Sequence, residues 1–106
     1  MQNIEELDFK NEVLSSSYPV CVCFTAPWCR TCYPACLIVS ELSAEYRDRI
    51  KFVEVNIGKY PILAEEYQVK VVPTVLIFHN GQPVNRILSY QEKSFIKDTF
   101  DAIVSG

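Results

Sequence analysis

The stretch Val20-Cys21-Val22-Cys23-Phe24-Thr25-Ala26-Pro27-Trp28-Cys29-Arg30-Thr31-Cys32 leads from an apolar run into two cysteines that are separated by two residues. Residues 20–24 are apolar throughout and are bounded by prolines, a pattern typical of a strand buried on both faces. From about Cys29 to Arg47, apolar residues recur every three or four positions, which predicts a helix with one apolar side. The paired cysteines are therefore predicted at a strand-to-helix turn.

The segments on either side of this unit predict further elements. Asp8 is a candidate cap for a short N-terminal helix. The expected strands cover residues 51–57, 74–79 and 84–89, and the expected helices cover residues 61–67 and 91–104. Asn80-Gly81 predicts a β-hairpin, because both residues accept a positive φ angle. We expect a single α/β domain over residues 1–106, with a mixed central sheet of four to five strands and helices on both faces.

Composition narrows the function classes. The chain has 106 residues, of which 49% are hydrophobic, enough for one buried core. Its formal net charge of −3 is spread among mixed charges, so no basic face for nucleic acid is expected. The first residues lack the basic start and apolar stretch of a signal peptide, and no later run is long enough to span a bilayer. We expect a cytoplasmic protein without membrane association.

Five cysteines, at positions 21, 23, 29, 32 and 36, lie in the first third of the chain. An odd, clustered set does not suit the disulfide framework of a secreted domain, and it indicates redox chemistry or metal binding. Disulfide exchange needs one thiolate that attacks and a second thiol that closes an internal disulfide, a spacing that Cys29 and Cys32 have. The helix N-terminus and the neighbouring cation of Arg30 both favour a thiolate on Cys29.

Three motifs strengthen the redox interpretation: Ala26-Pro27-Trp28-Cys29 with Cys32, then Val72-Pro73-Thr74, then Phe78-His79-Asn80-Gly81. In order and spacing they resemble the thioredoxin family along nearly the whole chain. The resemblance implies the thioredoxin fold and a protein dithiol–disulfide oxidoreductase that acts in cell redox homeostasis and electron transport. Cys29 matches the exposed attacking cysteine and Cys32 the buried resolving one.

The resemblance also implies partners and supporting residues. No cofactor is expected beyond the redox-active disulfide Cys29–Cys32. Partners would be disulfide-containing substrate proteins and a thioredoxin reductase, dependent on NADPH or ferredoxin, and the chain would be a monomer. Pro73 matches a cis-proline that faces the disulfide, although about 5–6% of X-Pro bonds are cis and sequence alone favours trans. Trp28, Val72 and Leu88 would offer an apolar groove to substrates, with Ser89 in place of a family glycine.

The sequence departs from the family pattern around the site. Arg30-Thr31 replaces the usual Gly-Pro, from which we expect a reduction potential less negative than the roughly −270 mV of thioredoxin. Cys23 stands where the family keeps a buried aspartate, and Glu54 replaces a lysine on the neighbouring strand. Our hypothesis is that Glu54 becomes the buried proton acceptor for Cys32; the alternative is that Glu54 reaches solvent and water carries the proton. Pro34 should bend the helix close to the thiols.

Other interpretations remain open at this stage. Cys29, Cys32 and Cys36, with Cys21 or Cys23, offer ligands for zinc or an iron–sulfur cluster, although the last two lie in a predicted strand. Cys36 is expected as a core residue rather than a third redox thiol, and Cys21 and Cys23 as packing. A redox-inert binding module with the same fold is a further alternative, and retention of both site cysteines argues against it.

Overall fold

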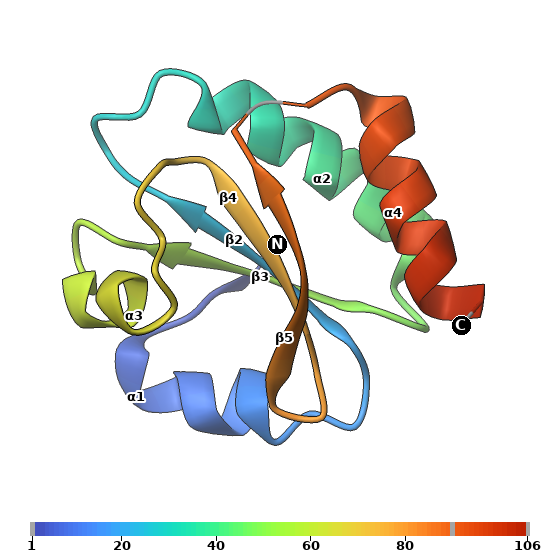
Figure 1. Ribbon diagram of the computed structural model, residues 1–106, viewed down its shortest axis with the longest axis horizontal. Helices are drawn as coiled ribbons and strands as arrows, with labels where there is room; N and C mark the ends of the chain where they lie inside the picture. Colours follow the sequence, from blue (N-terminus) through green and yellow to red (C-terminus); the bar gives the residue numbers. More distant parts are fainter. Residues whose placement is uncertain (1, 90, 106) are drawn as a thin grey trace.

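The computed structural model describes residues 2–89 and 91–105 and is built around one mixed β-sheet (Figure 1). The elements in chain order are β1 (Gln2–Asn3), α1 (Glu6–Phe9), the π-helical turn η1 (Lys10–Leu14), β2 (Val20–Thr25), α2 (Cys32–Tyr46), β3 (Lys51–Asn56), α3 (Pro61–Glu66), β4 (Thr74–His79), β5 (Gln82–Leu88) and α4 (Lys93–Ser105). The strand order is β1-β3-β2-β4-β5, with β2 parallel to β3 and antiparallel to β4. The predicted mixed sheet is confirmed.

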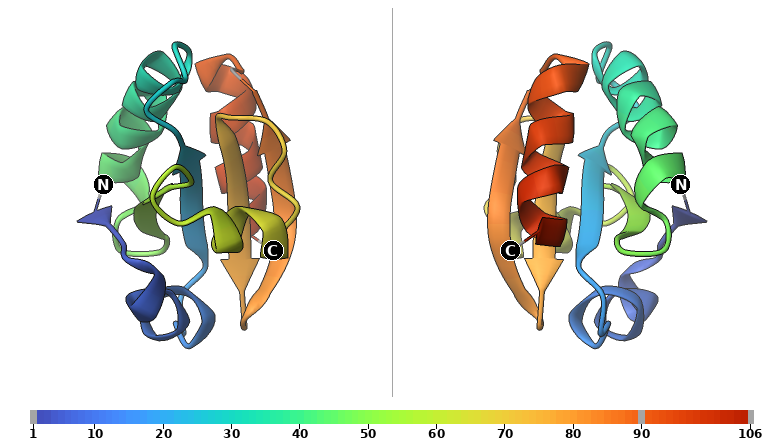
Figure 2. Two further views of the ribbon diagram at one scale, coloured as in Figure 1. Left: turned by 90° about the vertical axis from the view of Figure 1, so that its left-hand side faces the viewer. Right: turned by 90° about the vertical axis from the view of Figure 1, so that its right-hand side faces the viewer.

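Helices cover both faces of the sheet, as expected. Figure 2 shows α3 in front of the sheet in one view and α4 in front of it in the opposite view. Alternate residues of β2 point to opposite layers. Val20, Val22 and Phe24 pack in the cluster with α1, η1 and α3, while Cys21 and Cys23 pack in the cluster with α2 and α4. The central strand therefore places Cys23 beneath α2, the helix that carries Cys32.

The start of α2 differs from the prediction. The helix begins at Cys32 rather than at Cys29, because the chain first makes a turn in which the Cys29 N–H donates to the carbonyl of Ala26 at 3.1 Å. Pro34 thus occupies the first helical turn, where its missing N–H removes no bond of the helix. Arg30 lies before the helix, so Pro34 removes no hydrogen bond of α2 and the physical reason for the predicted bend near the thiols is absent.

Smaller differences concern the ends of the sheet and the first helix. The two-residue strand β1 was not expected; it pairs with β3 in parallel. Asp8 lies inside α1, whose N-cap is Glu5, so its predicted capping role is wrong. The hairpin turn is confirmed by φ angles of 55° at Asn80 and 79° at Gly81. Strand β5 starts two residues earlier than predicted and includes Pro83, which an edge strand tolerates.

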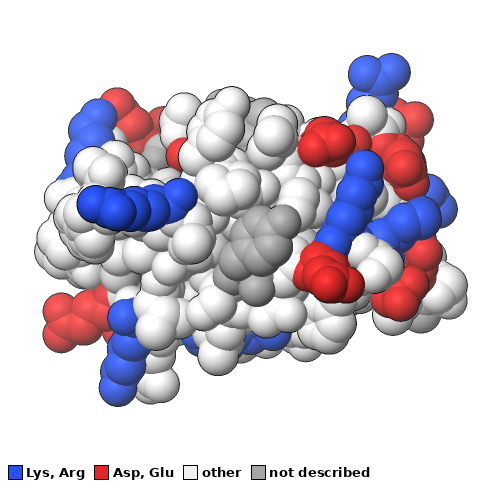
Figure 3. Space-filling model, turned by 90° about the horizontal axis from the view of Figure 1, so that it is seen from above, with Lys and Arg blue, Asp and Glu red and all other residues white. Residues whose placement is uncertain are grey.

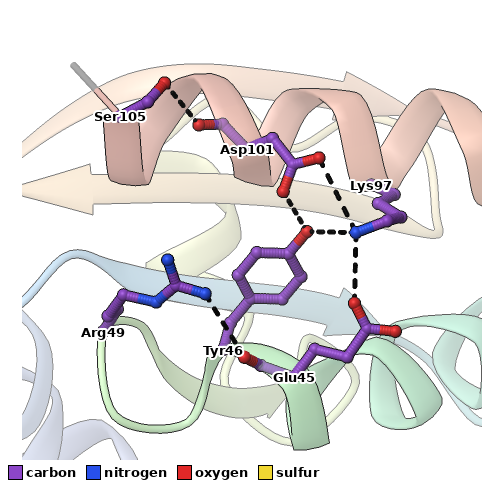
Figure 4. A network of polar contacts seen from close by, with 6 residues as sticks. All are labelled: Glu45, Tyr46, Arg49, Lys97, Asp101 and Ser105. Carbon is purple, nitrogen blue, oxygen red and sulfur yellow. Dashed lines mark hydrogen bonds and ion pairs between the residues drawn. The ribbon is translucent and has the colours of Figure 1, made fainter.

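The C-terminal part of α2 is fastened to α4 by a polar network (Figure 4). The buried Tyr46 hydroxyl donates to the carboxylate of Asp101, and Lys97 Nζ lies 3.0 Å from that hydroxyl and 3.1 Å from Glu45 Oε2. The Tyr46 ring also meets Phe100 edge to face, with centroids 5.5 Å apart. This anchor holds α2 at one end and leaves its N-terminal end to carry the site.

Among the helices of residues 2–89 and 91–105, none combines the length and apolar character that crossing a bilayer requires.

Candidate active site

A disulfide joins Cys29 and Cys32 at the beginning of α2, with 5.5 Å between their Cα atoms. The two sulfurs differ in environment. Cys29 lies half-buried in the turn before the helix, whereas Cys32 is its first residue and is only 5% exposed. The structure therefore holds the oxidised form of a pair in which one cysteine is more accessible than the other.

The N-terminus of α2 supplies the polar surroundings of this pair. The N–H groups of Cys32 and Tyr33 belong to the first helical turn and have no partner within the helix, and Ala35 donates to the carbonyl of Thr31 at 3.2 Å. Thr31 makes no side-chain cap and instead places its hydroxyl oxygen 3.7 Å from the Cys29 sulfur. Donors at a helix N-terminus favour negative charge on a nearby sulfur, so a thiolate is stabilised here.

The loop before β4 carries the second motif. The Val72–Pro73 peptide bond is cis, as the resemblance implied, and Pro73 is buried. The Pro73 carbonyl accepts a hydrogen bond from the Ser89 N–H at 2.8 Å, which ties this loop to the end of β5. Ser89 has a φ angle of 59°, in the left-handed region that glycine adopts freely. The glycine that the resemblance implied here would adopt this conformation without strain.

Trp28 projects from the turn with 67% of its surface exposed, so it is not a core residue. A Cβ atom added to Gly58 would lie 3.0 Å from Trp28 Cζ3 and 3.0 Å from Pro27 Cδ. Gly58 therefore lets this turn approach β3 closely, and Asn56 Oδ1 accepts from its N–H at 2.8 Å. This role of Gly58 was not predicted, although a glycine directly after a predicted inner strand was an available signal.

A family model described as Thioredoxin matches residues 1–102 of the chain. The chain belongs to the thioredoxin family. It is 38% identical to Thioredoxin 1 of Synechococcus elongatus over 98 residues, which cover 92% of each chain. It is 37% identical to Thioredoxin of Rickettsia typhi over 98 residues, covering 92% of this chain and 93% of the relative.

A third relative is the chloroplastic M-type thioredoxin of Chlamydomonas reinhardtii, which is 39% identical over 93 residues, covering 88% of this chain and 66% of the relative. Thioredoxins are thiol–disulfide oxidoreductases, and the Cys29–Cys32 disulfide lies at the position that this chemistry requires. The chain is accordingly an oxidoreductase of this class, with Cys29–Cys32 as its redox-active disulfide.

This thioredoxin-family site includes a pocket beside the disulfide. A pocket of about 260 Å³ is lined by Thr25, Ala26, Cys29, Cys32, Tyr33, Cys36 and Glu54. Glu54 is half-buried rather than fully buried, and its Oε2 accepts a hydrogen bond from the Thr25 hydroxyl at 3.1 Å. It is the register partner of Cys23 on β2. The structure thus brings Glu54 into one pocket with both site cysteines.

The remaining predicted site residues lie around this centre. Arg30 and Thr31 are exposed between the two cysteines. Val72 is half-buried beside the cis peptide bond, and Leu88 is 48% exposed on β5. Figure 3, seen from the end that carries the start of α2, shows that among the described residues most charged side chains lie toward the sides of this face.

Cys36 was expected to be a core residue, but the structure shows it only half-buried. It lines the pocket and places its sulfur 3.1 Å from the sulfur of Cys23. Cys21 and Cys23 are buried in the core, as predicted. In the part of the chain that the structure describes, no three His, Cys, Asp or Glu side chains gather as metal ligands, so the metal and iron–sulfur interpretations have no ligand cluster to rest on.

Proposed function

We propose that this chain reduces disulfides of substrate proteins, with Cys29 as the attacking cysteine and Cys32 as the resolving one. The observation that carries the proposal is the difference in exposure across the disulfide, half-buried at Cys29 against 5% exposed at Cys32. A protein disulfide can approach only the more accessible sulfur. The donors at the start of α2 also favour its thiolate form.

In the reducing direction the Cys29 thiolate attacks one sulfur of the substrate disulfide. That bond breaks, and the departing sulfur leaves as a thiolate and takes up a proton. Cys32 then loses its proton and attacks Cys29 Sγ, which releases the second substrate thiolate and forms Cys29–Cys32. Two electrons pass from the chain to the substrate, and the chain ends in the oxidised form described above.

Glu54 is the proposed proton acceptor for Cys32. Its carboxylate lines the pocket that both site cysteines share, and the Thr25 hydroxyl holds one of its oxygens. A base in this place removes the proton that Cys32 must lose before it attacks. Water is the alternative carrier, because the pocket is open to solvent and Glu54 is only half-buried.

The groove and the partners follow from the same proposal. Trp28, Val72, Leu88 and Ser89 lie at the same end of the sheet as Cys29 and would contact the substrate chain. A thioredoxin reductase, dependent on NADPH or ferredoxin, would restore the dithiol and thereby make the chain an electron carrier. We propose a cytoplasmic location, because clustered and mostly unpaired cysteines suit a reducing compartment.

An insulin-reduction assay with dithiothreitol as the electron source tests the proposal. The wild type should accelerate insulin reduction, and Cys29→Ser and Cys32→Ser should both lose that acceleration. Cys21→Ala is the matched control, because Cys21 is a buried cysteine outside the pocket, and it should remain active. Equal rates for the wild type and Cys29→Ser would contradict the proposal and favour the redox-inert binding module.

A further inference from the structure

Two cysteines outside the redox-active disulfide lie in contact directly beneath it. The sulfurs of Cys23 on β2 and Cys36 on α2 are 3.1 Å apart. A disulfide bond measures about 2.05 Å, so these sulfurs are only about 1 Å further apart than bonded ones. A displacement of about 1 Å therefore separates the two sulfurs from bonding distance.

Cys36 connects this pair to the active site. It lies four residues after Cys32 on α2, one helical turn away on the same side. Both residues line the 260 Å³ pocket that Cys29 also lines. Cys23, by contrast, is fully buried under the helix and reaches the pocket only through Cys36. Cys36 is therefore the member of the Cys23–Cys36 pair that shares a pocket with Cys29 and Cys32.

Hydrogen bonding and burial favour the thiolate more at Cys36 than at Cys23. The hydrogen bond with Cys36 and burial raise the pKa of Cys23 well above its ordinary value, and the charges of Cys21 and Glu54 add to the rise. The same hydrogen bond lowers the pKa of Cys36, against the opposing effects of partial burial and of the Glu54 charge. Cys36 is therefore the more acidic and the more accessible thiol of the pair, and so the better nucleophile.

We propose that Cys23 and Cys36 form a second dithiol–disulfide couple, which exchanges electrons with Cys29–Cys32 through a transient Cys32–Cys36 disulfide. The inference rests on the proposed function of Cys29–Cys32, because that disulfide is the oxidant. The Cys36 thiolate attacks Cys32 Sγ, the Cys29–Cys32 bond breaks, and Cys29 leaves as a thiolate that takes up a proton. Cys23 then loses its proton and attacks Cys36, which releases Cys32 as a thiolate and forms Cys23–Cys36.

The exchange oxidises one cysteine pair and reduces the other by the same two electrons. Its consequence is that Cys29 and Cys32 return to the dithiol without an external reductant. A fully reduced chain could then serve two substrate disulfides before it needs a reductase.

A redox titration of the full chain tests the couple. Reduced protein is equilibrated in glutathione buffers of increasing oxidised fraction, remaining thiols are alkylated, and the linked peptides are identified by mass spectrometry. The wild type should lose four thiols and give both a Cys29–Cys32 and a Cys23–Cys36 peptide. Cys36→Ser should lose two thiols and give only Cys29–Cys32. Cys21→Ala, which removes a buried cysteine from the same side of β2, should behave as the wild type.

Cys23→Ala combined with Cys29→Ser tests the exchange step, because it removes both the thiol that resolves the intermediate and the thiol that would reverse it. On oxidation this variant should form a Cys32–Cys36 peptide, and the absence of that peptide from the folded variant would overturn the exchange. If the wild type loses only two thiols and forms Cys29–Cys32 alone, the second couple is wrong while the proposed function stands. If Cys29–Cys32 does not form, both fail. Should the double variant not fold, the thiol counts of the wild type and Cys36→Ser still decide the inference.

Discussion

Cys29 and Cys32 are chemically identical residues that the chain places in different surroundings. Cys32 is buried as the first residue of α2, whereas Cys29 precedes the helix and has the Thr31 hydroxyl 3.7 Å from its sulfur. The direction of attack in the proposed reaction follows from this asymmetry. The residues between them, Arg30 and Thr31, are then the natural place to look for the tuning of the reduction potential.

Replacing Arg30-Thr31 by Gly-Pro should make the reduction potential more negative. A cation and a hydroxyl near the Cys29 sulfur favour the thiolate and hence the reduced form, so the wild type should lie above roughly −270 mV and the variant closer to it. Equilibration with glutathione measures both. Arg47→Ala, which removes an exposed charge at the far end of α2, should leave the potential unchanged. A wild-type potential at or below that of thioredoxin contradicts the expectation.

Glu54→Gln should slow the second step of the reaction, because a carboxamide cannot take the proton of Cys32. Loss of a general base costs about a hundredfold or more, which would show in the decay of the mixed disulfide at neutral pH. Glu41→Gln, an exposed carboxylate on α2, is the matched control. An unchanged decay rate across neutral pH would mean that water carries the proton.

At the residue scale, the sequence identified the reactive cysteine pair but not the residues that pack around it. The pair Cys29 and Cys32 was recognisable, because its spacing and its motif are local features of the chain. The contact between Cys23 and Cys36 was not, since it depends on how α2 packs across β2. The half-burial of Glu54 depends on the same packing and was likewise beyond the reach of a local pattern.

At the level of elements, α2 is the part that connects stability to function. Its N-terminal end carries the disulfide, while its C-terminal end is fastened to α4 through Tyr46 and Lys97 (Figure 4). A loosened anchor would lower the stability of the domain without touching the sulfurs. Stability and activity should therefore separate in variants of this network.

Tyr46→Phe should lower the free energy of unfolding by about 1 kcal/mol at neutral pH, because it removes the hydroxyl that joins Asp101 and Lys97. Denaturant unfolding measures the change. Tyr18→Phe, which alters an exposed tyrosine, should have no effect. Insulin reduction should be retained, and a loss of activity in folded Tyr46→Phe would contradict the separation of stability from chemistry.

The same substitution should change the response to alkaline pH. Burial, followed by the hydrogen bond to Asp101, raises the pKa of Tyr46. Above pH ~10 the unfolded chain loses this proton while the folded protein keeps it, so the free energy of unfolding of the wild type falls as pH rises. Phenylalanine has no such proton, and the stability gap between the two proteins should narrow above pH ~10.

Elements were predictable where a few adjacent residues decide them. The hairpin predicted from Asn80-Gly81 is confirmed, because the turn needs positive φ angles and these two residues adopt them. The start of α2 was predicted three residues early, since apolar spacing cannot register the turn from Ala26 to Cys29. Strand β1 was not predicted, because two residues are too few to show a hydrophobic periodicity. Its formation depends on pairing with β3, which is distant in the sequence.

On the scale of the whole molecule, the sheet brings separate motifs to one end of the domain. The turn after β2, the loop before β4 and the end of β5 meet there, linked in part by the hydrogen bond from Ser89 to Pro73. The mixed sheet could be predicted from the resemblance to the thioredoxin family, but not from any local sequence pattern.

Trp28→Ala should weaken reaction with protein substrates more than reaction with small disulfides. The exposed ring offers apolar surface to a docking chain, and its loss should reduce kcat/KM for insulin by about tenfold, equivalent to about 1.4 kcal/mol. A small aromatic disulfide should react at nearly the wild-type rate. Ile62→Ala, an exposed apolar residue of α3, is the control. An equal loss with both substrates would assign Trp28 to the chemistry of the thiols instead.

The most direct measurement is to trap the mixed disulfide and locate it. Cys32→Ser removes the resolving thiol, so reaction with insulin should stop at a stable one-to-one adduct. Mass mapping of that adduct should find the insulin cysteine joined to Cys29, and Cys29→Ser should give no such adduct. Attachment at Cys36 in Cys32→Ser, or no adduct at all, would contradict the assignment of Cys29 as the attacking residue.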